Sequence, residues 1–460
     1  MINLIKNEMY KILHKKGTYI VLIITALFIT LVSYLIGHEQ AYYVSTERYY
    51  DVDNGDITQD KINKEMNELY KDYNNKSWQY YVMDDVQALI SNYYYAKEGN
   101  YLDDAVENEY KSVKEALTSD NWQYFVKVNI NNLKEELKGY EESLKNSNSE
   151  KEKREIEKQI YSINVAIEMN EYRLKENIKY GDDYINNAID NITSSAGTIK
   201  NYETTTNEET KKDLENSVKD YYKFRYILEN KEDINNTSDL RYLMINFYSE
   251  YLFLILVFGV MIAGAIVSEE YNKGTIKSLL ITPYKRTKIL LSKFITTILL
   301  TILFIIVAYL MQVIIGGLFL GFGSLSNHVV EYNLKTSSIE VMSVFKYIII
   351  YSIANLPQIL LLVTLAFAAS TIIGNTALAI VITFAGVIGS SIVNIFAIGY
   401  KIDILKYFVT TNWDFNYYLF GGTSPYGTSL THAIVTCIIY FLIMIITTFI
   451  VFNKKNIKNI

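Results

Sequence analysis

The chain is poor in the residues that cross-link or interrupt a polypeptide. It has one cysteine, Cys437, which lies within an apolar run, and only three prolines among 460 residues. A single cysteine excludes an intrachain disulfide, so each part of the chain must hold together by packing and polar contacts alone.

Sequence signatures of several enzyme classes are also missing. The chain contains no Gly-x-x-x-x-Gly-Lys-Ser/Thr, no His-Glu-x-x-His, no Gly-x-Ser-x-Gly and no Cys-x-x-Cys. Without the first of these it lacks the usual cradle for ATP phosphates, so energy from ATP would have to come from a partner. The four histidines, His14, His38, His328 and His432, are far apart and near predicted membrane boundaries, which favours interfacial residues over metal ligands. We expect no enzyme and no metal site.

Charge divides the chain into two unlike parts. Residues His38 to Ile245 contain 42 of the 50 acidic residues and 27 of the 44 basic ones, whereas the remainder contains 8 acidic and 17 basic residues. An acidic insert therefore interrupts a basic, apolar protein. The abundance of Asn, Ile, Lys and Tyr is typical of AT-rich bacterial genomes.

Long apolar runs predict six membrane spans, because about 20 apolar residues cross a hydrocarbon core of about 30 Å. The predicted spans are Gly17–Gly37, Phe247–Val267, Ile289–Leu318, two within Tyr347–Gly399 that turn at Ser370–Asn375, and His432–Phe452. A signal peptide is the alternative for the first run, but the run is too long and no small-residue cleavage site follows it. None of the spans has Asp, Lys or Arg at its centre, which argues against a proton-coupled pump or an intramembrane aspartyl protease.

Basic residues predict the orientation of these spans. The N-terminus, the 268–293 loop and the C-terminus share one side and hold 13 of the 17 basic residues outside the insert. The positive-inside rule assigns that side to the cytoplasm of a bacterial cell, so residues 38–245 are expected outside. Residues 1–16 predict an interfacial helix with Ile5, Met9 and Ile12 on one face, and Lys293 is expected to extend to the cytoplasmic headgroups.

We therefore expect an all-α membrane protein with three parts: an interfacial helix and first span over 1–37, a helical extracellular domain over 38–245, and five spans with a cytoplasmic loop over 246–460. Apolar stripes on both sides of Asn146–Ser149 predict a coiled-coil-like helical hairpin near 125–180. Paired tyrosines recur through this domain. They favour half-buried packing over a surface that stacks against a ligand. Residues 319–346 and Tyr400–Thr431 are expected to be outside loops.

The segment Ser268–Phe294 is a charged island between two spans. Gly274 can end the preceding helix, Ile276, Leu279 and Leu280 fall on one helical face, and Thr282-Pro283 resembles an N-cap with a first-turn proline. These features predict a short amphipathic helix across the membrane surface. An ordinary basic loop placed by the positive-inside bias is the simpler interpretation.

The order of residues in this segment resembles the cytoplasmic coupling-helix region of the type-2 ABC exporter permeases. The resemblance implies that an ABC ATPase subunit contacts the following residues: Glu269, Glu270, Gly274, Thr275, Leu279, Leu280, Pro283 and Arg286. It further implies two ATPase subunits carrying ATP and Mg, a second permease copy or a paralogous permease, no cofactor on this chain, and outward movement of a peptide, antibiotic, lipid or ion. No nucleic-acid partner is expected.

Polar residues within or beside the spans are candidates for a translocation path. Glu250 is predicted at the outer end of the second span, and Asn355, Pro357 and Gln358 form a polar break within the fourth. Because backbone groups freed at such a break need internal partners, it should face protein or a cavity, and a kink accommodated by neighbouring helices is equally compatible. The alternative to the exporter is a membrane-anchored extracellular scaffold or receptor with no transport role.

Overall fold

The computed structural model describes residues 1–42, 57–231, 239–277, 283–400, 402–424 and 426–455. The chain forms two compact units, which we describe separately. The span unit comprises Met1–Gly37 and Thr237–Ile460, and the insert unit comprises His38–Asn236. Residues 237–245, which were predicted within the insert, thus belong to the span unit.

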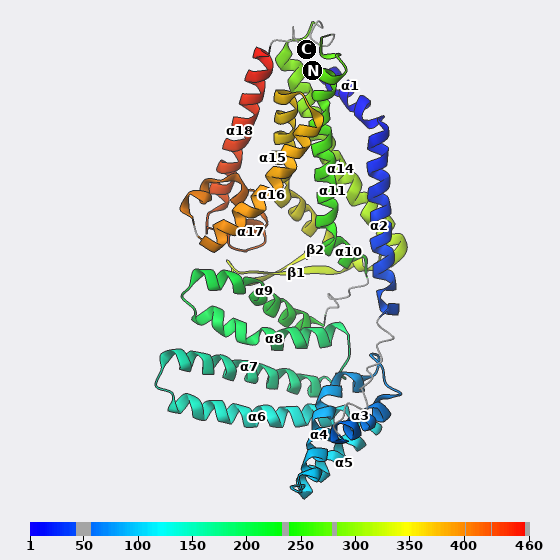
Figure 1. Ribbon diagram of the computed structural model, residues 1–460, viewed down its shortest axis with the longest axis vertical. Coiled ribbons are helices and arrows are strands. Elements are labelled where there is room, and N and C mark those ends of the chain that lie inside the picture. Colours follow the sequence, from blue (N-terminus) through cyan, green and yellow to red (C-terminus); the bar gives the residue numbers. More distant parts are fainter. Residues whose placement is uncertain (43–56, 232–238, 278–282, 401, 425, 456–460) are drawn as a thin grey trace. The chain divides into compact units, whose positions relative to one another are not determined.

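The six predicted spans are confirmed as helices that are long and apolar enough to cross a membrane. These helices are α2 (Lys16–Tyr42), α11 (Tyr248–Ile266), α14 (Arg286–Leu320), α15 (Val344–Ile373), α16 (Thr376–Tyr400) and α18 (Leu430–Lys454). The amphipathic helix α1 (Ile2–Leu13) precedes them. In Figure 1, α1 and the last turn of α18 lie at one end of the span unit, which we call the termini end.

Helix α11 is the centre of the span unit. In its most apolar 18-residue stretch, 72% is buried inside the protein, compared with 17% in the corresponding stretches of α16 and of α18. Helix α11 contacts α14, α15 and α16. Gly259 allows this packing, since a Cβ there would lie 2.9 Å from Thr301 Oγ1. The exposed apolar faces of α16 and α18 are of the kind that lipid covers.

The predicted turn between the fourth and fifth spans is confirmed. Helix α15 ends at Ile373, and the next residue, Gly374, caps it with a φ of +76° and a ψ of 18°, in the left-handed region. Its amide donates to Ser370 O at 2.9 Å, and α16 begins two residues later. Glycine adopts this conformation without the steric cost that a Cβ would add.

The opposite end of the span unit corrects one prediction. Residues 319–346, predicted as a loop, contain the antiparallel hairpin of β1 (His328–Asn333) and β2 (Ser338–Ser343), a small addition to a fold that is otherwise helical as predicted. Asn333 Oδ1 accepts from the amides of Lys335 and Thr336 and thereby closes the turn between the strands. The short helices η3 (Gly323–Ser326), η4 (Asp403–Tyr407), η5 (Val409–Thr411) and α17 (Asn416–Leu419) complete this end.

A short helix explains the shifted boundary of the insert. Helix α10 (Leu240–Asn246) precedes α11, and Gln312 of α14 donates from Nε2 to Leu243 O at 3.0 Å. Arg241, which is only 1% exposed, donates from Nη1 to His328 O at 3.3 Å. Residues 240–246 are thus bonded to α14 and to the β-hairpin, which the end of an apolar run does not reveal.

The insert unit is helical. Its elements are α3 (Ile57–Tyr70), η2 (Trp78–Val82), α4 (Met83–Glu98), α5 (Asp104–Thr118), α6 (Trp122–Asn146), α7 (Glu150–Lys175), α8 (Tyr184–Thr204) and α9 (Glu208–Asn230). Helices α6 and α7 form a hairpin at the predicted turn, where Ser149 accepts from the amide of Glu152. Helices α6 to α9 lie side by side, each against the next (Figure 1).

Several tyrosines of the insert pack between its helices, as the simpler interpretation predicted for them, whereas Tyr95 and Tyr101 are exposed. Tyr93 stacks on Tyr110 with ring centroids 3.9 Å apart. Tyr94 and Tyr110 donate to the two oxygens of Glu65 at 2.7 and 2.6 Å, and Lys114 donates to Glu65 at 2.7 Å. Burial opposes ionisation of Glu65, but these hydrogen bonds lower its pKa below the ordinary value. Glu65 therefore joins α3 to α4 and α5.

Candidate functional site

A buried ion-pair cluster joins α1 to the body of the span unit. Lys293 of α14, only 2% exposed, donates from Nζ to Glu8 Oε2 at 2.9 Å and to Glu270 Oε1 at 3.2 Å. The prediction that Lys293 extends to the headgroups is wrong. Two carboxylates neutralise its charge inside the protein. An ammonium near a membrane needs such partners when it does not reach water.

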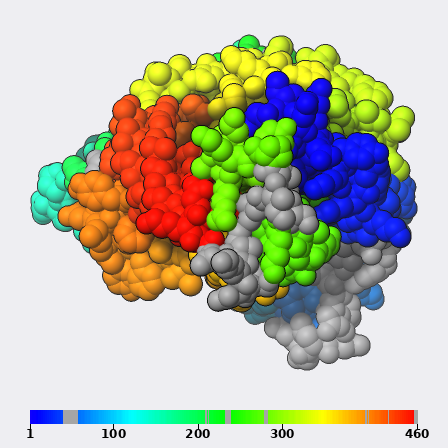
Figure 2. Space-filling model, turned by 90° about the horizontal axis from the view of Figure 1, so that it is seen from above, coloured from blue at the N-terminus to red at the C-terminus, as the bar shows by residue number. Residues whose placement is uncertain are grey.

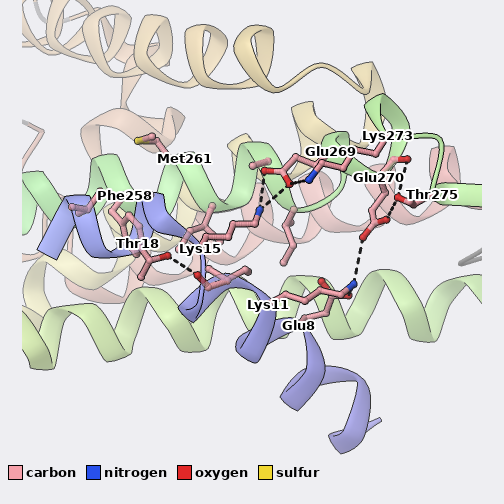
Figure 3. Close-up of a pocket in the computed structure, with 16 residues that line it drawn as sticks. Glu8, Lys11, Lys15, Thr18, Phe258, Met261, Glu269, Glu270, Lys273 and Thr275 are labelled. Atoms are coloured by element: carbon pink, nitrogen blue, oxygen red, sulfur yellow. Dashed lines mark hydrogen bonds and ion pairs between the residues drawn. The ribbon is translucent and has the colours of Figure 1, made fainter.

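Three further lysines extend this cluster along one side of α11 (Figure 3). Lys15 donates to both oxygens of Glu269 at 2.8 Å, and Lys273 reaches the same carboxylate at 3.1 Å. Lys11 lies 3.3 Å from Glu8 Oε1 and 3.7 Å from Glu270 Oε1. We call these seven charged residues the ion-pair cluster.

The loop that follows α11 begins as the sequence predicted. Helix α12 (Ser268–Asn272) ends before Gly274, whose φ of +68° marks the predicted break. Helical backbone resumes at Ile276, which is 1% exposed and belongs to the main apolar core. Residues 278–282, which include Leu279, Leu280 and Thr282, lie outside the described part of the chain.

The predicted helix start at Thr282-Pro283 is wrong for its described part. Pro283 lies in a bend, and α14 begins at Arg286 with Lys285 as its N-cap residue. Hydrogen bonds attach the start of α14 to the end of α18, because Arg286 Nη1 donates to Asn453 O at 3.4 Å and to Lys455 O at 3.2 Å. The guanidinium thus satisfies carbonyls at the end of α18, where a cation is also favoured by the helix dipole.

A second cation joins further helix ends at the termini end. Lys455 donates from Nζ to Ile372 O at 3.0 Å, at the end of α15, and its ammonium lies 4.5 Å from the ring centroid of Tyr271 in α12. The amide of Ser268 donates to Ser370 Oγ at 3.2 Å. In Figure 2 the green surface that contains α12 and the start of α14 lies between the blue of α1 and α2 and the red of α18.

A groove of about 500 Å³ runs between α1, the start of α2, α11 and α12. One part is lined by members of the ion-pair cluster and the other by Val21, Phe258 and Met261, as Figure 3 shows for its labelled residues. Within the described ranges, no three His, Cys, Asp or Glu residues lie close enough together to hold a metal ion. The groove is thus a mixed ionic and apolar surface.

The eight residues predicted to contact an ATPase fall into three groups. Gly274, Thr275 and Pro283 are exposed. Glu269, Glu270 and Arg286 are partly buried and hold contacts within the chain. Leu279 and Leu280 lie among the undescribed residues. Beside Pro283, Tyr284 is 42% exposed and was not singled out from the sequence.

Sequence reasoning also missed the partners of the ion-pair cluster. Two signals were available: Glu8 is the only acidic residue among the first 38, and Lys293 lies inside a predicted span. Each is a charge in surroundings that disfavour it, which indicates a partner of opposite sign. Their pairing across 285 positions has no local sequence pattern.

Two of the predicted path residues, Asn355 and Pro357, lie in the part of α15 that contacts the segment around α17. Asn355 Nδ2 donates to Tyr351 O at 2.8 Å, and Asn416 Nδ2 donates to Asn355 Oδ1 at 3.4 Å. The amide of Phe415 donates to Ala354 O at 3.3 Å, just before Pro357. The polar break therefore faces protein, namely the segment around α17.

The other two path residues differ in exposure. Glu250 is exposed in the first turn of α11, and Tyr351 lies within electrostatic reach of it. Gln358 is half-buried in α15.

Comparisons with known proteins match about half of the chain. The chain is 28% identical over 259 residues to "Uncharacterized protein YhcI" of Bacillus subtilis (strain 168), which is 55% of this chain and 82% of that relative. It is 25% identical over 214 residues to "Uncharacterized membrane protein YdbK" of the same organism, which is 45% of this chain and 78% of that relative. No solved structure matches the chain.

A family model matches residues 208–458, which include α11 to α18 and both strands. Its description is "Protein of unknown function (DUF2705)". Since the match spans more than half of the 460 residues, the chain belongs to the DUF2705 family.

Proposed function

We propose that this chain is the membrane permease subunit of an ATP-driven ABC exporter that works with a separate ATPase subunit. In this proposal the termini end faces the cytoplasm and the insert unit lies outside. The transported substrate is a peptide, antibiotic, lipid or ion. The chain itself catalyses no reaction, and ATP and Mg bind to two ATPase subunits that contact a pair of permeases.

The observation that carries the proposal is the two-sided character of the loop between α11 and α14. On one side it presents Gly274, Thr275, Pro283 and Tyr284 to the surroundings. On the other, Glu269 pairs with Lys15, between α1 and α2, and Glu270 pairs with Lys11 of α1 and Lys293 of α14. A partner that pushes on the exposed side would move these packed helices together, as a coupling element requires.

The contacts of Arg286 and Lys455 support the same role. They connect the start of α14 to the end of α18, and the residue after α18 to the end of α15. A displacement of the loop would therefore reach helices that are distant in sequence. Packed helices tend to shift as rigid elements between discrete arrangements, so a small movement at the loop can alter the whole bundle.

Co-purification tests this proposal. A tagged full-length chain is purified in mild detergent from membranes of the organism that encodes it, and bound ATPase subunits are identified by mass spectrometry. Tyr284→Asp places a charge on the exposed side of the loop, and we expect at least about a tenfold loss of bound ATPase, since central aromatic contacts often contribute about 2 kcal/mol or more. Tyr10→Asp is the matched control, because Tyr10 is 63% exposed on α1 at the same end.

Arg286→Glu is a less selective probe, because it also removes the donor to the α18 carbonyls. Absence of any ATPase from the parent preparation, together with normal folding, would instead favour the membrane-anchored scaffold or receptor. The separately compact insert unit favours that second function, since a receptor needs a folded domain of this kind.

A further inference from the structure

The groove beside the ion-pair cluster has two chemically different parts. Its charged part contains three lysines and three glutamates: Lys11, Lys15, Lys273, Glu8, Glu269 and Glu270. Its apolar part contains Val21, Phe258, Met261 and Ile262. At about 500 Å³ it falls within the usual range of ligand pockets, about 300–1,000 Å³. A ligand that fills it must therefore combine a charged group with an apolar chain.

The position of the groove matches the boundary of a membrane. Its charged part lies where α2 begins and α11 ends, and its apolar part follows the same two helices inward. Met261 is 46% exposed, and Ile20 and Ile24 of α2 are 55% and 51% exposed. The apolar part is thus continuous with a helix surface that lipid would cover.

The charges of the groove favour a head that carries both signs. Lys15 and Lys273 converge on Glu269, and their side chains remain 42%, 66% and 32% exposed respectively. A phosphate could accept from the two ammonium groups, and a primary ammonium could donate to the exposed face of the carboxylate. A purely anionic head would meet the same carboxylate without compensation.

We propose that this groove binds one zwitterionic phospholipid of the phosphatidylethanolamine class, taken from the leaflet on the side of the termini. Its phosphate contacts Lys15 and Lys273, its ammonium contacts Glu269, and one acyl chain lies against Val21, Phe258 and Met261. The site requires no ATPase partner, so it stands independently of the exporter proposal.

The test measures lipid binding to the purified full-length chain by native mass spectrometry. Phosphatidylethanolamine and phosphatidylglycerol with identical acyl chains are titrated separately into delipidated protein. We expect phosphatidylethanolamine to bind at least about fivefold more tightly. Equal affinity for the two lipids would overturn the assignment of the head, and displacement of both by detergent at its working concentration would show an adventitious additive only.

Two variants examine the two parts of the site. Met261→Trp should fill the apolar part and lower affinity at least about tenfold, whereas Ile349→Trp, at a residue 59% exposed on α15, should not. Glu269→Gln should remove the preference between the two lipids while leaving phosphatidylglycerol binding unchanged or stronger. An unchanged preference in Glu269→Gln, or unchanged affinity in Met261→Trp, would refute the site.

Folding is controlled by the thermal melt of each variant in the same detergent. Should Met261→Trp lower the melting temperature, Val21→Trp fills the groove from its opposite wall and carries the same expectation. Binding that is lost equally in Ile349→Trp and the groove variants would also contradict the proposal, since it would indicate lipid bound over the whole apolar surface.

Discussion

Replacing Lys293 by methionine should release α1 from the span unit. The substitution keeps the apolar stem of the side chain but removes the ammonium that pairs with Glu8 at 2.9 Å and Glu270 at 3.2 Å. Two carboxylates, whose side chains are only 10% and 15% exposed, are then left without their principal cation. Since α1 has few other polar attachments to α14, its docking should weaken first.

The expected cost follows from the geometry. At an effective dielectric constant of about 20, a charge pair at about 3 Å contributes about 5 kcal/mol, most of which is offset by desolvation. Removing one partner of a buried pair nevertheless costs about 3–5 kcal/mol. Lys11 remains 3.3 Å from Glu8 and is 48% exposed, so we expect a reduced cost of about 2–3 kcal/mol for docked α1.

Cysteine labelling measures this local opening. Ile12 of α1 is 5% exposed, and Ile12→Cys provides a thiol that reacts only when α1 leaves its site. Because about 1.4 kcal/mol corresponds to a tenfold change, Lys293→Met should accelerate labelling of the introduced thiol about 30- to 150-fold. The native Cys437, 7% exposed, serves as an internal control that should stay protected in both proteins.

A double substitution separates charge from packing. In the double variant Glu8→Gln, Lys293→Met, the carboxylate of Glu8 is absent, so it no longer needs a cation. Most of the protection of the Ile12→Cys thiol from labelling should therefore return. Equal labelling rates in the parent and Lys293→Met would refute the role given to this ion pair. Simultaneous exposure of Cys437 would instead indicate that the whole span unit had unfolded.

Two further substitutions test other parts of the chain. Gly374→Ala places a Cβ on a residue with a φ of +76°, which costs about 1 kcal/mol and should lower the melting temperature by about 2–4 °C. Gly323→Ala is the control, because a Cβ there meets open space and should leave the melting temperature unchanged. Equal melting temperatures for the two variants would contradict this expectation. Glu65→Gln removes a carboxylate whose pKa is lowered on folding, so in the parent its contribution is present at neutral pH and lost as pH falls from about 4.5 through the folded pKa. The variant should be about 1.5–3 kcal/mol less stable at pH 7 with a flatter acid limb, measured by hydrogen exchange in α3 to α5, and an unchanged limb would show that Glu65 does not titrate in this way.

The extent of the spans was predictable because it depends on local composition. Apolar runs located all six spans, and the predicted turn at Ser370–Asn375 contains Gly374, which ends α15. The hairpin of α6 and α7 also followed from apolar stripes and a polar turn. These features require only near neighbours in the chain, which a sequence displays directly.

Contacts between distant segments were not predictable in the same way. Glu8 pairs with Lys293, Lys15 with Glu269, and Arg286 with carbonyls at the end of α18. From the sequence alone, several other residues of suitable charge were equally good candidates for each partner. The β-hairpin was missed because its strands have only six residues each and follow a glycine- and serine-containing segment, Gly321–Ser326, that resembles a loop. The charge of a residue in apolar surroundings indicates that it has a partner, but tertiary packing determines which residue that partner is.

The position of Lys455 has a practical consequence for handling this protein. Its ammonium donates to a carbonyl at the end of α15, although α16 and the whole of α18 separate the two in the sequence. A purification tag or fluorescent fusion attached by cutting the chain back to Lys454 would therefore uncap a helix more than eighty positions away. Fusions should be appended after Lys455, with a spacer, if the native arrangement is to be kept.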